Sequence, residues 1–329
     1  DHSLDRPVAI KIIPPHLSRH PDVLERFQKE ARAAARLNHP GIVEIYGIGR
    51  QDDIHFFVME YLEGSPLEKI LEEEGRLSPQ RSLKIISRVA AALEHAHRKG
   101  FVHRDIKPSN IIYNRENGLV KVTDFGIAKA LEEGTRLTAS DVRLGTPRYM
   151  SPEQVRGEDL DPRSDLFSLG VVFFQMLTGR GPFGGDSFLV IMRNIIEEPL
   201  RYPAEPDPPI PDELKKILDK LLAKEPDQRY GSASELIRDI AAYQAGQTVK
   251  PLPPGSRSRI SLAGLAGWVL PAAALGIGIY LVATLSPPRF QSPPLPRPVA
   301  PLNRTAAPES AADREERARM LFQKAEEMG

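Results

Sequence analysis

A run of 26 residues without a single charge, Ile260–Leu285, limits most strongly how this chain can fold. As a helix that rises about 1.5 Å per residue it would be about 39 Å long, enough to cross a hydrocarbon layer about 30 Å thick. The alternative is a helix buried in a protein core, but the proline-rich flanks leave no core for it to enter. The run is therefore predicted to be a transmembrane helix, and the globular part must come from the residues before it.

The prolines divide the chain in the same way, because 12 of the 31 fall between Pro251 and Pro308. Residues 1–247 mix strand-like runs with amphipathic helical patterns, and they are predicted to form one folded domain. Residues 248–259 would link this domain to the span. Residues 286–310 would form an extended proline-rich linker, and residues 311–329 the start of a truncated helical segment.

Charge and cysteine content exclude several classes of protein. The chain has 44 basic and 44 acidic residues, so no net charge attracts it to nucleic acid, and we expect no such partner. It has no cysteine, which excludes disulfides, thiolate zinc sites, iron–sulfur clusters and a cysteine nucleophile.

Two motifs carry the residue types that phosphoryl transfer from ATP requires. They are His103–Asn110, which reads HRDIKPSN, and Asp124–Gly126, which reads DFG and begins fourteen residues later. Transfer needs metal ions held by oxygen ligands and an acceptor hydroxyl held in line. Asp124 and Asn110 offer hard oxygen ligands suited to Mg²⁺. Asp105 is a candidate to orient, or to deprotonate, the incoming hydroxyl.

A candidate phosphate-binding pair lies upstream. The strand-like segment Val8–Lys11 ends in a lysine, and Glu30 follows nineteen residues later, inside a predicted helix over residues 24–37. A strand lysine paired with a glutamate on the facing helix would position the α- and β-phosphates of ATP. Each residue alone would usually be a surface charge, so the prediction depends on the order and spacing of the whole set.

With these motifs in this order, the chain resembles the eukaryotic-like Ser/Thr protein kinases over about residues 1–245. The resemblance implies an α+β, bilobal protein kinase fold, here followed by one transmembrane helix. Its β-rich N-lobe would cover about residues 1–60 without the first strand, and its helical C-lobe about residues 65–247. The resemblance also implies ATP and Mg²⁺, with Mn²⁺ possible. Lys107 is what Ser/Thr-directed members carry to hold the γ-phosphate, and Thr146 indicates the same specificity.

Further family positions match in the C-lobe and in the hinge between the lobes. Residues 145–153 look like the substrate-docking loop. The structural matches are His103, Asp165 as the anchor of the catalytic loop, and Arg229 as the buried partner of Glu153. The adenine-binding matches lie in and around the hinge. They are Met59 as the gatekeeper, the backbone of Glu60 and Leu62, and Ala9 and Ile112 on the two faces of the ring.

The resemblance also predicts regulation by phosphorylation. Arg104 directly precedes Asp105, and a guanidinium there is suited to a bidentate contact with phosphate. Lys129 matches the second cation of that pocket. Thr138 and Ser140 lie where related bacterial kinases autophosphorylate, and a phosphate there would order the loop through these cations. We expect autophosphorylation in trans, hence a homodimer.

The match departs from the family at one place. The Gly-rich loop that should precede the Val8 strand is missing, because only residues 1–7 come before it. We expect a truncation, and we expect the fragment as given to bind ATP poorly. One alternative is a catalytically silent receptor or scaffold, which the intact Lys11, Asp105, Asn110 and Asp124 argue against. Another is a small-molecule phosphotransferase, which the docking loop argues against.

Charges around the span predict its orientation only weakly. Lys250, Arg257 and Arg259 lie within ten residues before it and Arg289 alone within ten after it, but counts over twenty residues are equal. The need for ATP places the kinase domain on the cytoplasmic side of the plasma (inner) membrane, with the C-terminal segment outside. This arrangement resembles bacterial single-pass receptor-type Ser/Thr kinases. The expected partners are the membrane, a second copy, and proteins with Ser/Thr acceptors.

Overall fold

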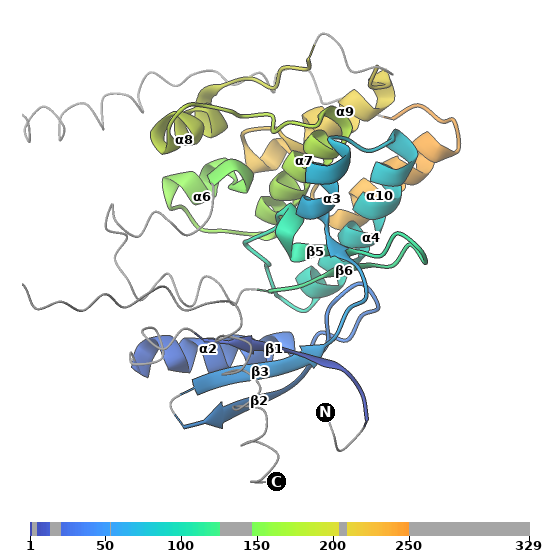
Figure 1. Cartoon of the computed structure of the whole chain (residues 1–329). Coiled ribbons are helices and arrows are strands. Elements are labelled where there is room, and N and C mark those ends of the chain that lie inside the picture. Colours follow the sequence, from blue (N-terminus) through green and yellow to red (C-terminus); the bar gives the residue numbers. More distant parts are fainter. Residues whose placement is uncertain (2–4, 14–20, 53, 126–146, 204–208, 250–329) are drawn as a thin grey trace, which may run out of the picture. The chain divides into compact units, whose positions relative to one another are not determined.

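The computed structural model describes residues 1, 5–13, 21–52, 54–125, 147–203 and 209–249 (Figure 1). The predicted span at 260–285, the linker at 286–310, the segment at 311–329 and all but the first two residues of the linker at 248–259 lie outside these residues. None of the helices in the described ranges is long and apolar enough to cross a membrane. The transmembrane helix therefore stays a prediction.

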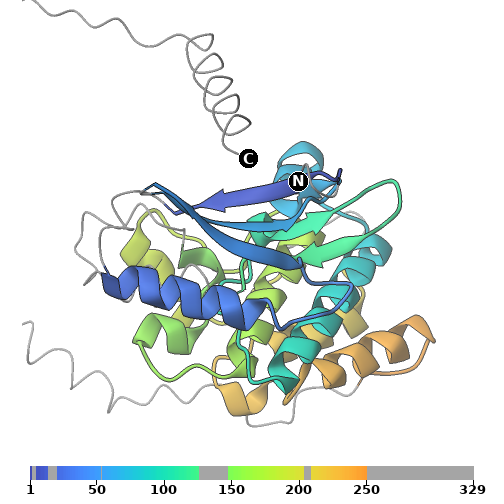
Figure 2. The ribbon, with the colours of Figure 1, turned by 90° about the horizontal axis from the view of Figure 1, so that it is seen from below.

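The N-lobe is a three-stranded antiparallel sheet with one helix along it (Figures 1 and 2). Its strands are β1 (Val8–Ile12), β2 (Ile45–Gln51) and β3 (Ile54–Glu60), in the order β1-β3-β2. Residues directly opposite each other share a face, so the pairing of Lys11 with Phe57 puts the lysine on the side of a fully buried ring.

Helix α2 (Pro21–Ala34) ends before the predicted boundary at residue 37. The chain turns at Ala35 and Arg36, and the Leu37 amide bonds to the carbonyl of Ala34, three residues back. Leu37 is still buried, at 2% exposure, so the apolar pattern continues past the helix into the turn. This is why the pattern predicts a longer helix than the chain forms.

A second, smaller sheet lies between the N-lobe and the helices. It pairs β4 (Ser65–Pro66), β5 (Ile111–Tyr113) and β6 (Val120–Val122) in an antiparallel order. The N-lobe is joined to it by backbone bonds, because the Val43 amide donates to the Val122 carbonyl at 3.0 Å and the Val122 amide donates to the Gly41 carbonyl at 2.8 Å. These contacts hold β6, which leads into the Asp124 segment, against residues 41–43 of the N-lobe.

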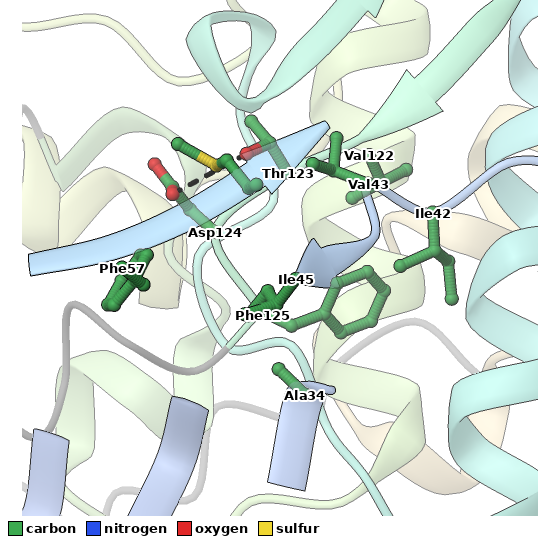
Figure 3. Close-up of a pocket in the computed structure, with 10 residues that line it drawn as sticks. Ala34, Ile42, Val43, Ile45, Phe57, Val122, Thr123, Asp124 and Phe125 are labelled. Atoms are coloured by element: carbon green, nitrogen blue, oxygen red, sulfur yellow. Dashed lines mark hydrogen bonds between the residues drawn. The ribbon is translucent and has the colours of Figure 1, made fainter. Parts of the chain in front are cut away.

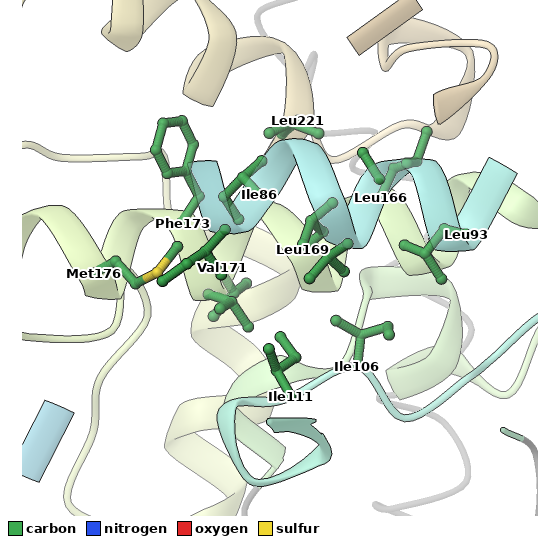
Figure 4. Packing of buried hydrophobic residues seen from close by; sticks show 14 of the residues in the cluster. Ile86, Leu93, Ile106, Ile111, Leu166, Leu169, Val171, Phe173, Met176 and Leu221 are labelled. Carbon is green, nitrogen blue, oxygen red and sulfur yellow. The ribbon is translucent and has the colours of Figure 1, made fainter. Parts of the chain in front are cut away.

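Helices form the rest of the C-lobe around one hydrophobic core (Figure 4). Helix α7 is buried along almost its whole length and packs on α4 and α9. An Asp161 side chain caps its N-terminus, and Gly179 ends it in the left-handed conformation. The described helices are α3 (Leu67–Glu74), α4 (Pro79–Arg98), α6 (Pro152–Arg156), α7 (Pro162–Thr178), α8 (Phe188–Glu197), α9 (Asp212–Leu221) and α10 (Ala233–Gln244), with 3₁₀ turns at Pro108–Asn110, Pro147–Tyr149 and Pro226–Gln228.

Candidate active site

Two side chains of the His103–Asn110 segment meet at the carboxylate of a third, Asp105. The Lys107 ammonium lies 2.8 Å from Asp105 Oδ2, and Asn110 Nδ2 donates to the same oxygen at 2.9 Å. Asn110 Nδ2 also donates to the Asp105 carbonyl at 2.8 Å. The side chains of Asp105 and Lys107 are 33% and 29% exposed, so a substrate in solution can reach them.

A buried aspartate on α7 holds the backbone of this segment. Asp165 is 1% exposed, and it accepts hydrogen bonds from the amides of His103 at 2.8 Å and Arg104 at 2.7 Å. The ring nitrogen Nε2 of His97 also contacts it at 2.7 Å. Asp165 thus fixes the two residues that precede Asp105, as its predicted anchoring role requires.

The Asp124 segment packs beside the catalytic segment. The Thr123 amide donates to the Asn110 carbonyl at 3.0 Å, and the Thr123 carbonyl lies 2.9 Å from His103 Nε2. The Phe125 ring packs against the His103 ring, with centroids 4.5 Å apart. Asp124 itself has a φ of 64°, a left-handed conformation that aspartate tolerates better than most residues.

Lys11 contacts Asp124 across the junction of the two lobes. Its ammonium lies 2.5 Å from Asp124 Oδ1, and the two side chains are 36% and 22% exposed. The backbone of Glu30 lies in α2, but its side chain is outside what the structure describes, so the predicted Lys11–Glu30 pair stays a prediction. The lysine of the N-lobe and the carboxylate of the DFG segment are nevertheless brought to one place.

A pocket opens between α2, the N-lobe sheet and the DFG segment (Figure 3). Phe125 projects toward Ala34 and Ile45 there, and Met59 lines the same pocket. The lining residues are Ala34, Ile42, Val43, Ile45, Phe57, Met59, Val122, Thr123, Asp124 and Phe125. Met59 therefore lies at an apolar pocket beside the site, where a gatekeeper is expected.

The predicted adenine-binding residues come from both lobes. Ala9 pairs with Met59 in the N-lobe sheet and so shares its face. Ile112 lies on β5 and is partly exposed. Glu60 and Leu62 begin the segment between the lobes, and both are partly exposed.

The Glu153–Arg229 pair is buried behind the docking segment. The guanidinium of Arg229 donates to both carboxylate oxygens of Glu153, at 2.7 and 2.8 Å, and the Ser164 hydroxyl donates to the first of them at 2.7 Å. Burial alone would raise the pKa of Glu153, but the hydrogen bonds and charge of Arg229 outweigh it and lower the pKa to about 2. Glu153 is thus ionised wherever the protein is folded near neutral pH.

Four predicted residues lie outside the described residues: Lys129, Thr138, Ser140 and Thr146. The same holds for Gly126 of the DFG segment. Arg104 is described, and its side chain is exposed. The predicted phosphate contact of Arg104 and Lys129 therefore stays a prediction.

The donor set fits Mg²⁺ bound together with a nucleotide. Mg²⁺ usually takes one or two protein oxygens and completes its coordination with phosphate oxygens and water. Asp124 and Asn110 offer a carboxylate and an amide oxygen on adjacent segments. No group of three or more acidic or histidine side chains suited to holding a metal by themselves occurs among the described residues. Two protein oxygens leave the remaining coordination positions of Mg²⁺ to phosphate oxygens and water.

Comparison with known proteins agrees with this geometry. The model of the protein kinase domain matches residues 1–240. The chain belongs to the protein kinase family. Over 254 residues this kinase domain is 44% identical to a probable serine/threonine-protein kinase of Streptomyces coelicolor, covering 76% of this chain and 38% of that protein. Over 240 residues it is 41% identical to the serine/threonine-protein kinase PrkC of Bacillus subtilis, covering 73% of this chain and 37% of that protein.

A solved structure shows the same fold. The kinase domain of PknI from Mycobacterium tuberculosis aligns with a TM-score of 0.54 at 26% identity, covering 73% of this chain and 85% of that one. The predicted bilobal protein kinase fold is therefore confirmed. The chain spans about two fifths of the length of the curated relatives described above.

Sequence reasoning missed some contacts of this kinase domain. Lys121 on β6 forms an ion pair with the Glu60 carboxylate at 2.5 Å, whereas only the Glu60 backbone was assigned a role. His97 was not singled out, although it contacts Asp165. A polar residue on the buried face of a helix is a signal for such a contact, and His97 follows the buried Ala96 on the apolar face of α4.

Proposed function

We propose that this kinase domain transfers the γ-phosphate of ATP to Ser or Thr hydroxyls of proteins, as part of a membrane-anchored Ser/Thr kinase. The observation that carries the proposal is the convergence of Lys107 and Asn110 on the Asp105 carboxylate, with Lys11 at Asp124 beside it. A catalytically silent scaffold has no need to keep these side chains together.

The residues divide the work of phosphoryl transfer. Asp105 accepts a hydrogen bond from the substrate hydroxyl and orients its oxygen toward the γ-phosphate. Lys107, already 2.8 Å from Asp105, supplies a positive charge where the transferred phosphoryl group and the hydroxyl meet. Asn110 holds Asp105 from the other side and keeps its own carbonyl oxygen for a metal ion.

Lys11 and Asp124 hold the nucleotide. The Lys11 ammonium would bind the phosphates of ATP, and Asp124 and Asn110 would hold Mg²⁺. Mg²⁺ supplies charge neutralisation of the phosphate oxygens when bound. The Lys11 ammonium and the Asp124 carboxylate already lie 2.5 Å apart, so the cation and the metal ligand of the proposal are close together without a nucleotide.

The proposal extends to regulation and location. Autophosphorylation of Thr138 or Ser140 by a second copy would add negative charge near Arg104 and Lys129 and order the loop. Anchoring by residues 260–285 would raise the local concentration of copies and favour this reaction in trans. ATP supply places the domain on the cytoplasmic face of the plasma membrane. Proteins with Ser or Thr acceptors are the substrates.

Labelled-phosphate transfer by the full-length protein tests the proposal. We expect Asp105→Asn and Lys11→Met each to lower kcat by at least about a hundredfold, with the melting temperature nearly unchanged, because both remove groups that act at the phosphate. Arg193→Gln, at an exposed helix position remote in sequence from the motifs, is the control and should retain wild-type activity. A wild-type protein that transfers no phosphate, or an active Asp105→Asn variant, would contradict the proposal.

A further inference from the structure

One side chain joins the docking segment, here residues 147–156 with helix α6, to the catalytic segment His103–Asn110. Gln154 lies in α6, and its Oε1 accepts a hydrogen bond from the Ser151 amide at 2.9 Å. Its Nε2 donates to the carbonyl oxygen of Arg104 at 2.8 Å, fifty residues earlier in the chain. Arg104 directly precedes Asp105, so the amide of Gln154 reaches the peptide group that carries the proposed catalytic carboxylate.

That peptide group is held on both of its polar atoms. The carbonyl oxygen of Arg104 accepts from Gln154, and the amide of Asp105 donates to His103 Nδ1 at 3.2 Å. Arg104 has a φ of 68°, in the left-handed region that a long side chain rarely adopts. A backbone in this conformation persists where its surroundings hold it, and here the partners of the peptide do so.

Asp165 does not hold this peptide by itself. It accepts from the amides of His103 and Arg104, which belong to the two preceding peptide groups. The orientation of the Arg104–Asp105 peptide thus depends on His103 and Gln154. Since Asp105 Cα is attached to this peptide, rotating it would move the Asp105 carboxylate away from Lys107 and Asn110.

We propose that Gln154 is a positioning residue: through its bond to the Arg104 carbonyl it sets the direction of the Asp105 carboxylate and couples the docking segment to catalysis. The proposal rests on the proposed role of Asp105 in phosphoryl transfer. Gln154 thus has a role in addition to capping the N-terminus of the five-residue helix α6.

The chemistry of the side chain permits a sharp test, because only an amide has both an acceptor and a donor here. Glutamate at position 154 would still accept from the Ser151 amide and complete the capping box of α6. It could not donate to the Arg104 carbonyl and would face that oxygen with a second acceptor. Lysine would have the opposite capacity, donating to the carbonyl without accepting from Ser151.

The experiment measures kcat, KM for ATP and for a protein substrate, and the melting temperature of the full-length protein. For Gln154→Glu we expect an unchanged melting temperature and a kcat lowered about three- to tenfold, with KM for ATP within about twofold. For Gln154→Lys we expect a lower melting temperature and a kcat close to that of the wild type. Gln244→Glu, the same substitution at the exposed end of α10, is the control and should leave all three unchanged.

Two results would overturn the proposal. One is a wild-type kcat in Gln154→Glu, since the peptide would then not need its donor. The other is a loss of kcat in Gln154→Lys as large as that in Gln154→Glu, since the effect would then not follow the donor. A wild type without phosphotransfer would overturn the proposed function as well, so the two failures are distinguishable.

Discussion

At the scale of single residues, Glu153 and Arg229 form a buried ion pair in the C-lobe. Both side chains are nearly inaccessible, at 4% and 0% exposure. Arg229 also donates to the carbonyls of Ala223 and Lys224, so its remaining donors are satisfied. Removing one partner of such a pair leaves an uncompensated charge in the protein interior.

We therefore predict that Glu153→Gln destabilises the domain by about 3 to 5 kcal/mol, measured by urea unfolding. The pKa of Glu153 is lowered from 4.5 to about 2, so its ionised form stabilises the fold above about pH 4.5, and this stabilisation is lost as the pH falls from 4.5 toward 2. The wild type should lose more stability over this range than the variant does. An equal loss of stability in both proteins would contradict the assignment. The control is Arg193→Gln, which removes an exposed ion pair with Glu197 and should lose as much stability over this pH range as the wild type does.

Single residues also show what the sequence predicts and what it leaves open. The residue types at Asp105, Lys107 and Asn110 predict a shared site, and these three lie within six residues of one another. The contact of the Lys11 ammonium with Asp124 was not predicted, and the predicted pair of Lys11 with Glu30 stays a prediction. A contact between segments so far apart depends on how the lobes pack, and no local pattern contains that information.

At the scale of elements, helix α7 shows how closely the C-lobe is packed. A Cβ atom on Gly170 would lie 2.7 Å from the Cβ of Leu221 on α9 and 3.1 Å from Leu222. Leu221 is fully buried, so it has little room to move. The glycine, which would be unfavourable in a helix by itself, allows the two helices to approach this closely.

We predict that Gly170→Ala destabilises the domain by about 1 to 3 kcal/mol, because overpacking outweighs the better helix propensity of alanine, which favours the helix by about 1 kcal/mol. Thermal unfolding would measure the change. Gly181→Ala is the matched control, since nothing lies within 4 Å of its added Cβ, and it should leave the melting temperature nearly unchanged. An equal effect of the two substitutions would rule out the packing explanation.

Element positions follow from the sequence better than element ends do. The apolar pattern over residues 24–37 predicts a helix where α2 lies, but it includes a buried turn residue, Leu37, beyond the helix end. The ion pair of Lys121 with Glu60 illustrates a second limit. This ion pair forms because β6 packs beside the end of β3. The resemblance to the kinase fold implies that the two strands are near each other, but the charge pattern of the sequence does not specify which charged residues meet.

At the scale of the whole molecule, the last described residue before the predicted span, Val249, is attached to the C-lobe. Val249 is 1% exposed, and its amide donates to the Glu213 carboxylate on α9 at 2.7 Å. The chain is therefore attached to the C-lobe eleven residues before Ile260.

The last prediction concerns this span. Expressed in bacteria, the full-length protein should stay in the membrane fraction through an alkaline carbonate wash, whereas residues 1–247 alone should be soluble, because 26 uncharged residues supply enough apolar length to cross the bilayer. Replacing Val269 and Leu275 with arginine should shift the protein to the wash supernatant, since each charge costs about 2.5 to 3.5 kcal/mol near the centre of a membrane helix. Replacing the same two residues with alanine is the control and should leave it in the membrane. Release of the wild-type protein by the wash would show that residues 260–285 do not span the membrane, and the kinase assignment of residues 1–240 would be unaffected.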